Sequence, residues 1–247
     1  MNFLDPRIDY IKKRFEKINR VIGVSSAKGG VGKSTISTFI SLLLKQKGLK
    51  TGLLDLDIYG PSTHVILGVK NIKLNENYGV EPLKIDNLKY FSSIFFTDNK
   101  PFLMRGDELS DAILEILTIV NWEELDFLVI DMPPGFGEPT LDLLRLIKKI
   151  EFLIITNPSI ISLETVKKLI LTLKEGNYKI LGLIENMKIN DNNLIIDSCE
   201  ELKINYLGSV PFFYDIEALF GNVDMMIESN VSLYLDKVLN KILINSF

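Results

Sequence analysis

Cysteine is almost absent from this chain, since Cys199 is the only one among its 247 residues. A single thiol cannot form an intramolecular disulfide, and such sparse use of cysteine fits a reducing compartment. No stretch approaches 18 consecutive apolar residues, so no membrane-spanning helix is predicted. The first residues, MNFLDPRIDYIKKRFEK, carry acids early and lack an apolar core, so they do not match a secretory signal peptide. These absences predict a cytoplasmic protein without a membrane partner.

An excess of charge of either sign is also missing. The chain has 28 lysines and arginines against 32 aspartates and glutamates, for a net charge of −4 and a pI of about 5.2. That balance gives no general electrostatic reason to bind nucleic acid. Hydrophobic residues make up 47% of the chain, which predicts a globular protein with a full core. The length suits one domain over residues 1–247.

Histidine is equally scarce. His64 is the only one, and it lies in PSTHVILG after a Gly-Pro turn. A metal site needs several ligands, and no second ligand lies near His64 in the sequence. We therefore expect a helix-surface or packing residue rather than a metal ligand.

Short apolar runs alternate along the chain with amphipathic helical patterns. The runs predict strands buried on both faces, because few of them alternate in polarity. They are VIGVSSA (21–27), KTGLLDLD (50–57), KYFSSIFF (89–96), DFLVIDM (126–132), EFLIITN (151–157), KILGLIENM (179–187) and INYLGSVP (204–211). The helical patterns fall at about 34–47, 105–120, 138–149, 160–175 and 231–245. This order predicts an α/β fold with a doubly wound, mostly parallel sheet flanked by helices on both faces.

Three segments are expected at the periphery of that sheet. An N-terminal helix within residues 1–19 would dock through Ile8, Ile11, Phe15 and Ile18 and leave Lys12, Lys13, Arg14 and Lys17 solvated, or in contact with an acidic partner. Residues 70–90 are polar and rich in turn formers, which indicates a hairpin excursion. The C-terminal helix at 231–245 has few basic residues on its polar face, so we expect it to pack on the core rather than on a membrane.

A glycine-rich turn follows the first predicted strand and opens a helix. Its sequence is SSAKGGVGKST (25–35), which is a phosphate-binding loop in its required strand–turn–helix context. Glycines let backbone N–H groups point at phosphate oxygens, and the helix N-terminus favours an anion. Lys33 would reach the β- and γ-phosphates, Ser34 would ligate Mg²⁺, and Thr35 would bond an α-phosphate. The predicted ATP-binding residues here are Lys28, Gly29, Gly30, Val31, Gly32, Lys33, Ser34 and Thr35.

The loop contains a second lysine, Lys28, that phosphate binding within one chain does not require. A lysine at the loop entrance could reach a phosphate bound by a second copy of the protein. It would then supply positive charge in trans to the transition state, as an arginine finger does. The alternative is a solvated surface lysine.

Two acidic motifs follow later strands. LLDLDIYGPS places Asp55 and Asp57 at a strand end, where α/β sheets bind ligands. We predict that Asp57 positions the attacking water and that Asp55 holds Mg²⁺ through water; both could instead be strand-end caps. FLVIDMPPG places Asp131 after four apolar residues, which suits a Mg²⁺-bound water. The N–H of Gly135, in the turn that follows, could sense a γ-phosphate, unless this is an ordinary Pro-Pro-Gly turn.

Together these motifs resemble a known family. KGGVGKST, with its extra lysine, resembles the deviant Walker A motif of the MinD/ParA superfamily of P-loop ATPases, and DLDIYGPS, DMPPG, ENM and SVP resemble its Mrp/ApbC branch. The resemblance covers roughly residues 20–220 and implies an ATP-dependent homodimer in which Lys28 crosses to the partner's ATP. It also implies adenine contacts from Asn186 and Pro211, and that Asp57 and Asp131 are the acids of the two switch regions. Arg105, which opens a helix, resembles a family motif of unassigned role.

The resemblance is incomplete at one point. Mrp/ApbC proteins are iron–sulfur cluster carriers that usually hold a C-x-x-C just after the ENM motif, and this sequence has none. Clusters generally need four thiolates, whereas a dimer of this chain offers two. Cys199, in an early helical turn, is expected in or near the core.

The predicted function is an ATP-hydrolysing, Mg²⁺-dependent homodimeric switch in iron–sulfur or metallocofactor assembly. The usual cluster ligands are missing from the chain, and the partner expected besides a second copy is an iron–sulfur scaffold or acceptor protein. The alternatives are a MinD/ParA-like positioning ATPase and an ATP-dependent regulatory binding protein.

Overall fold

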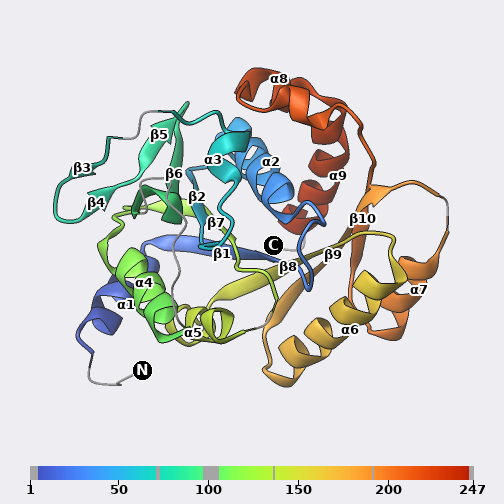
Figure 1. The fold of residues 1–247 in the computed structure, drawn as a ribbon, viewed down its shortest axis with the longest axis horizontal. Coiled ribbons are helices and arrows are strands. Elements are labelled where there is room, and N and C mark those ends of the chain that lie inside the picture. Colours follow the sequence, from blue (N-terminus) through green and yellow to red (C-terminus); the bar gives the residue numbers. More distant parts are fainter. Residues whose placement is uncertain (1–4, 71–72, 97–105, 136, 191, 245–247) are drawn as a thin grey trace.

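A central sheet dominates the computed structural model, which describes residues 5–70, 73–96, 106–135, 137–190 and 192–244 (Figure 1). Within those residues the sheet has eight strands in the order β10-β9-β8-β1-β7-β2-β6-β5. Every neighbouring pair is parallel except β5 with β6. The strands are β1 (Ile18–Ser25), β2 (Thr51–Asp55), β5 (Leu83–Ile85), β6 (Leu88–Ser92), β7 (Leu125–Asp131), β8 (Ile150–Thr156), β9 (Lys179–Lys188) and β10 (Tyr206–Pro211). The predicted α/β fold with a mostly parallel sheet is confirmed.

Helices cover both faces of the sheet, as a parallel sheet requires. They are α1 (Arg7–Glu16), α2 (Lys33–Gln46), α3 (Thr63–Ile66), α4 (Gly106–Ile119), α5 (Glu138–Leu146), α6 (Ile160–Glu175), α7 (Leu194–Glu201), α8 (Val223–Glu228) and α9 (Asn230–Ile244). Helices α1, α4, α5, α6 and α7 bury apolar side chains in one cluster, and α2, α3, α8 and α9 bury theirs in a second cluster on the opposite face (Figure 1). The short helices α3, α7 and α8 are not among the helical ranges predicted above, although a helix is expected around His64 and around Cys199.

The N-terminal helix is shorter than predicted. It ends at Glu16, and Ile18 is the first residue of β1 rather than part of the helical face. Ile11 and Phe15 are buried against the body as expected. Arg14 is only partly solvated, because its guanidinium donates hydrogen bonds to the carbonyls of Val120 (3.2 Å) and Tyr78 (3.2 Å). The exposed part of the basic face is therefore the three lysines Lys12, Lys13 and Lys17.

Residues 70–90 contain two hairpins rather than one. The first pairs β3 (Asn75–Glu76) with β4 (Val80–Glu81) outside the main sheet, and the second pairs β5 with β6 at the edge of it. The strand predicted over 89–96 ends at Ser92, and η1 (Ser93–Phe96) is a 3₁₀-helix. Its turn brings the ring of Phe95 back onto Tyr90 and Phe91, at centroid distances of 5.6 and 5.2 Å. Aromatic packing thus ends the strand early.

The later helices agree with their predicted places, with one shortened end. Helix α5 stops at Leu146 instead of residue 149, because β8 already begins at Ile150. The C-terminal helix buries one apolar face, made by Val231, Leu235, Val238, Leu239 and Ile242, so its predicted core packing is confirmed. Arg105 and residue 245 lie outside the described residues. Among the residues that are described, none of the helices is both long and apolar enough for a membrane crossing.

Candidate nucleotide site

The glycine-rich loop joins the carboxyl end of β1 to the first residue of α2, Lys33. Gly30 and Gly32 have φ angles of +77° and +82°, a conformation that favours glycine. A Cβ atom built at Gly29 or Gly30 would meet no heavy atom within 4 Å, so the space in front of the loop is open. The residues present therefore fit the phosphates of a nucleotide, with backbone N–H groups and a helix N-terminus available to them.

A buried cluster of charged and hydroxyl groups lies directly under the loop. Lys33 Nζ is 2.8 Å from Asp131 Oδ1, and the Asp131 side chain is fully buried. Ser34 Oγ donates to Asp131 Oδ2 at 2.6 Å, and Ser37 Oγ donates to Asp131 Oδ1 at 2.9 Å. Taking a charged pair out of water is costly, so such a pair is weak evidence for stability and a reasonable sign of function. Ser37 is a member of this cluster that the sequence pattern did not indicate.

Asp55, at the end of β2, and Asp57, just after it, have different surroundings. Asp55 is fully buried next to Asp131 in the matched register of β2 and β7. Its carboxylate accepts hydrogen bonds from Thr63 Oγ1 (2.6 Å) and from the backbone N–H of Asp57 (3.0 Å). Burial, with the charge of Asp131 adding to it, raises the pKa of Asp55 to about 7. Asp55 thus fixes the turn into α3 in this arrangement.

Asp57 faces Lys33, the buried lysine of the loop. Its Oδ2 is 3.7 Å from Lys33 Nζ, and its side chain keeps 14% of its surface exposed. Burial raises the pKa of Asp57, and the positive charge of Lys33 partly offsets that rise. Asp57 therefore lies beside the loop and has access to solvent. Asp55 has no such access, because it is fully buried.

Gly135 contacts the phosphate-binding loop through its backbone. Its φ angle is +81°, and its N–H donates to the carbonyl of Ser26 at 3.1 Å. Thr140 Oγ1 donates to the carbonyl of Gly135 at 3.3 Å. A γ-phosphate bound by this N–H would have to replace the bond to Ser26. The Gly135 N–H can bond either the Ser26 carbonyl or a γ-phosphate, but not both, so loss of the phosphate could change the position of this turn.

Asn186 lies against the loop, a contact that the sequence pattern did not indicate. Its side chain is 6% exposed, and its Nδ2 donates to the carbonyl of Val31 at 2.9 Å. A Cβ at Gly32 would lie 2.2 Å from that nitrogen, so only glycine allows this approach. Pro211, at the end of β10, lines a cavity of about 380 Å³ together with Phe213 and Tyr234. Both residues predicted to contact adenine thus lie toward the carboxyl ends of their strands, and Asn186 contacts the loop.

Removing the Asn186 amide tests the role of this contact. Asn186→Ala is expected to lower the free energy of unfolding by about 1–2 kcal/mol, because a buried hydrogen bond is lost. It should also weaken ATP binding by about ten-fold, or 1.4 kcal/mol, because the loop loses its support. Asn205→Ala is the matched control, since Asn205 Nδ2 bonds the Leu181 carbonyl at 3.2 Å away from the loop. Unchanged ATP affinity in Asn186→Ala, measured by calorimetry, would contradict this role.

Lys28, the second lysine of the loop, is exposed. Its backbone carbonyl accepts a hydrogen bond from Ser26 Oγ at 3.0 Å. Across the described ranges the Lys28 ammonium forms no salt bridge, in contrast to the buried Lys33. The two lysines of one motif therefore differ in placement: one is bound inside the chain and one is directed to the surface.

Cys199 is a core residue, as expected. It is 2% exposed and lies near the end of α7, not in an early turn. Burial raises the pKa of the Cys199 thiol to about 11, and the nearby Glu185 adds to the shift. His64 is half-buried in α3. In the part of the chain that is described, no group of three or more metal-ligating side chains comes together.

Comparisons with known proteins identify a family of P-loop NTPases. A family model described as "NUBPL iron-transfer P-loop NTPase" matches residues 17–245. The "Iron-sulfur cluster carrier protein" of Aquifex aeolicus is 36% identical over 182 residues, which cover 72% of this chain and 50% of that protein. The "Cytosolic Fe-S cluster assembly factor Nubp2 homolog" of Drosophila pseudoobscura is 32% identical over 234 residues, which cover 86% of this chain and 91% of that protein. This chain thus spans about half the length of the Aquifex relative and nearly all of the Drosophila one.

Solved structures support the same assignment. A nucleotide-binding protein from Archaeoglobus fulgidus, in complex with ADP, matches with a TM-score of 0.77 and 27% identity over 92% of this chain and 95% of that one. The cell division ATPase MinD of Pyrococcus furiosus matches with a TM-score of 0.67 over 92% of this chain and 99% of that one, and its 21% identity shows the fold alone. The chain therefore belongs to the NUBPL-type iron-transfer P-loop NTPases, the family of iron–sulfur cluster carriers within the MinD/ParA superfamily.

Proposed function

We propose that this chain is an ATP-hydrolysing homodimeric switch in iron–sulfur cluster or metallocofactor assembly. The observation that carries the proposal is that one lysine of the loop, Lys33, is buried against Asp131 while a second lysine of the same loop, Lys28, is exposed. A lysine that serves its own phosphates is already present in Lys33, so Lys28 is available to a neighbouring copy. The ADP bound to the Archaeoglobus relative supports a nucleotide at this loop.

The residues of the site suit ATP and Mg²⁺, with a distinct role for each. Bound ATP·Mg²⁺ would supply the phosphoryl group and the charge that neutralises it. Ser34 and Asp131, whose side-chain oxygens are 2.6 Å apart, would hold the ion, and Asp55, which is buried beside Asp131, would act through a water bound to the ion. Lys33 would exchange Asp131 for the phosphates, and Asp57 would orient the attacking water. Gly135 would report the γ-phosphate by giving up its bond to Ser26.

Exposed apolar side chains at the same edge of the sheet support self-association. Ile160 and Ile161 follow β8, Ile189 follows β9, and Tyr214 follows β10, and all four are more than two-thirds exposed. Exposed apolar side chains that gather on one side of a protein often mark an interaction surface. A two-fold dimer through this edge would bring Lys28 of each copy toward the other copy's phosphates.

The cargo would need ligands from a partner protein. Cys199 is buried with a protonated thiol, and two chains together offer two thiolates where a cluster generally takes four. The residues of this chain alone therefore do not fit a bridging cluster. We infer that a scaffold or acceptor protein supplies the missing thiolates, while ATP controls its association with this chain.

A positioning function on membrane or DNA has less support. The apolar face of α9 is buried, so it is not free to enter a lipid surface. The net charge of −4 gives no general attraction to DNA. We therefore infer a cytoplasmic role without membrane or nucleic acid, as the name of the cytosolic Drosophila relative suggests.

Anaerobic reconstitution with iron and sulfide tests the cargo arrangement. We expect no stable cluster on the ATP-loaded chain alone, read by visible absorbance and iron per dimer, because four thiolates are not present. Cys199→Ser is the control, and it should behave like the native chain. A stable cluster that Cys199→Ser abolishes would show that this chain carries the cluster itself and would overturn the inferred partner.

A further inference from the structure

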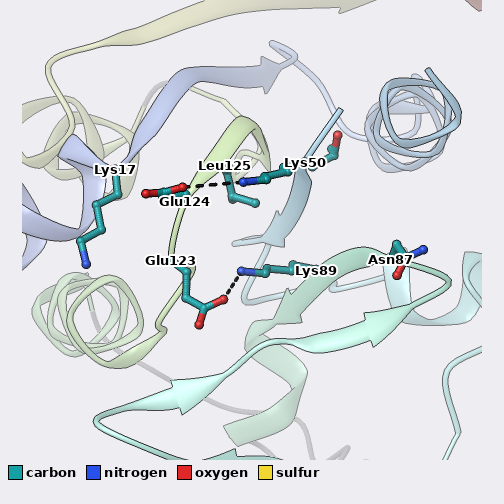
Figure 2. Close-up of a pocket in the computed structure, with 8 residues that line it drawn as sticks. Lys17, Lys50, Asn87, Lys89, Glu123, Glu124 and Leu125 are labelled. Atoms are coloured by element: carbon teal, nitrogen blue, oxygen red, sulfur yellow. Dashed lines mark hydrogen bonds and ion pairs between the residues drawn. The ribbon is translucent and has the colours of Figure 1, made fainter. Parts of the chain in front are cut away.

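A cationic groove lies at the edge of the sheet opposite the nucleotide site. It consists of two adjoining cavities, of about 560 and 200 Å³, that share Lys17 and Glu123. We define the amino-edge groove by Lys13, Arg14, Lys17, Lys50, Lys89 and Glu123. Figure 2 shows the larger cavity, with its lysines coming from separate segments of the chain and Glu123 reaching toward Lys89. The groove is elongated, because the second cavity extends it toward α1.

The topology of the sheet explains why these lysines meet. Lys17 immediately precedes β1, Lys50 precedes β2, and Glu124 precedes β7. These three strands are parallel neighbours, so their amino ends lie at one edge of the sheet. The glycine-rich loop follows the other end of β1, which has eight residues and spans about 26 Å. The groove is therefore a separate site from the nucleotide site.

Positive charge exceeds negative charge along the groove. Five cationic side chains line it, against the two carboxylates of Glu123 and Glu124. The Lys89 ammonium is already paired within the chain, since its Nζ donates to Glu123 at 2.7 Å and to the Trp122 carbonyl at 2.6 Å. Lys50 has a long, exposed contact of 3.6 Å with Glu124. The chain as a whole has a net charge of −4, so this local excess of positive charge is unlike the rest of the surface. A positively charged surface attracts a negatively charged partner.

Two of the lysines are available to such a partner. Lys13 and Lys17 are exposed and form no salt bridge with any of the described residues. Arg14 is fixed between two carbonyls and adds its charge to the wall without a carboxylate partner among those residues. The hydrogen bond from Lys89, with the charges of Lys84 and Lys17 adding to it, holds the pKa of Glu123 below its ordinary value. The groove thus has a positive field that its own acids do not cancel.

Three residues that border the groove have left-handed backbone conformations, two of them in the turns of the two hairpins. Tyr78, Asn87 and Glu123 have φ angles of +50°, +67° and +56°. Residues other than glycine adopt this conformation less often, and asparagine does so more readily than tyrosine or glutamate. Tyr78 is 96% exposed and Tyr10 is 62% exposed beside the smaller cavity. The border of the groove therefore also has exposed aromatic side chains. These would contact the apolar side chains of a peptide, whereas a small ion would make no such contact.

We propose that the amino-edge groove binds an acidic segment of a partner protein. A peptide can place its carboxylates at Lys13, Lys17 and Lys50 while its apolar side chains contact the two tyrosines. The evenly spaced phosphates of a nucleic acid would also meet Glu123 and Glu124, which a peptide can avoid. The inference does not depend on the ATPase activity, because the groove lies across the sheet from the glycine-rich loop.

The test is a binding titration with the intact chain. The probe is a fluorescein-labelled peptide of alternating glutamate and serine, about twelve residues long, followed by anisotropy at low salt. Lys17→Glu and Lys50→Glu should each weaken binding at least about five-fold. Lys168→Glu, the same charge reversal at an exposed position on α6, should leave binding unchanged. All three variants should bind ATP as the native chain does, which shows that they are folded.

A label-free signal comes from Trp122, the only tryptophan of the chain. It is buried directly beside the groove, and its carbonyl accepts the hydrogen bond from Lys89. Its emission should change with the same midpoint as the peptide anisotropy. Equal weakening by Lys168→Glu, or equal binding of a glutamine-for-glutamate peptide, would overturn the proposal. Tighter binding of an oligouridylate or of phosphatidylserine vesicles would overturn it in favour of nucleic acid or membrane.

Discussion

Lys28→Ala is expected to abolish ATP turnover while leaving ATP binding nearly intact. Charge supplied in trans to a phosphoryl transition state accelerates hydrolysis by roughly a thousand-fold or more, so a loss of that size is expected in kcat. Binding should persist because Lys33 and the backbone of the loop remain. The ATP-dependent dimer should weaken as well, since Lys28 would be one of its contacts. Steady-state phosphate release and calorimetric ATP binding measure the two effects separately.

The control for that variant is Lys168→Ala, which removes one exposed lysine from α6. It should hydrolyse ATP as the native chain does. If Lys28→Ala also hydrolyses ATP at the native rate, Lys28 is a solvated surface residue and its role in trans is wrong.

Asp57→Ala is expected to trap an ATP-bound dimer. Asp57 is the carboxylate beside Lys33 that keeps access to solvent, so its loss should remove the group that orients water without removing the phosphate site. Hydrolysis should fall by about 10²–10⁴-fold, the usual contribution of a positioned acid–base group. Light scattering after gel filtration should then show a dimer that persists with ATP and dissociates with ADP.

Asp224→Ala, which removes an exposed aspartate from α8, is the matched control and should turn over ATP normally. An Asp57→Ala protein that remains monomeric in ATP and hydrolyses it at the full rate would rule out the proposed role. Rapid hydrolysis within a stable dimer would instead place water activation on another residue.

The sequence predicted those parts of the site that are formed within a single segment of the chain. The strand, glycine-rich turn and helix from residue 20 to 47 follow from apolar runs and glycine spacing alone. Asp55, Asp57 and Asp131 could be placed at one edge because parallel strands end together. Pattern reasoning therefore reached the residue types and the edge of the sheet where they meet.

Contacts between distant segments were beyond that reasoning. The Asn186 bond to Val31 joins β9 to the loop after β1, although β8 lies between those strands in the sheet. The bond from Gly135 to Ser26 depends on how two turns face each other. Each residue by itself is an ordinary loop amide or glycine, so only the three-dimensional arrangement shows its partner.

The amino-edge groove was hidden for a similar reason. Lys17, Lys50 and Lys89 are spread along the sequence, and each one alone is an ordinary surface lysine. They converge because Lys17 and Lys50 precede β1 and β2, Lys89 lies at the start of β6, and these strands follow one another as β1-β7-β2-β6 in the sheet. The sequence pattern indicated only the basic face of the N-terminal helix, and it included Arg14, which the structure shows bonded to backbone carbonyls.

Subunit mixing tests the central claim, that the ATP site is shared between two copies, most directly. Lys28→Ala and Asp57→Ala chains would be mixed in equal amounts in ADP, and ATP would then be added. If Lys28 acts in trans, each mixed dimer has one complete site, formed by Asp57 of one copy and Lys28 of the other. Half of the dimers are mixed, so about a quarter of the native rate should return. If Lys28 acts within its own chain, neither site is complete, and a mixture no more active than its two parents would contradict the account.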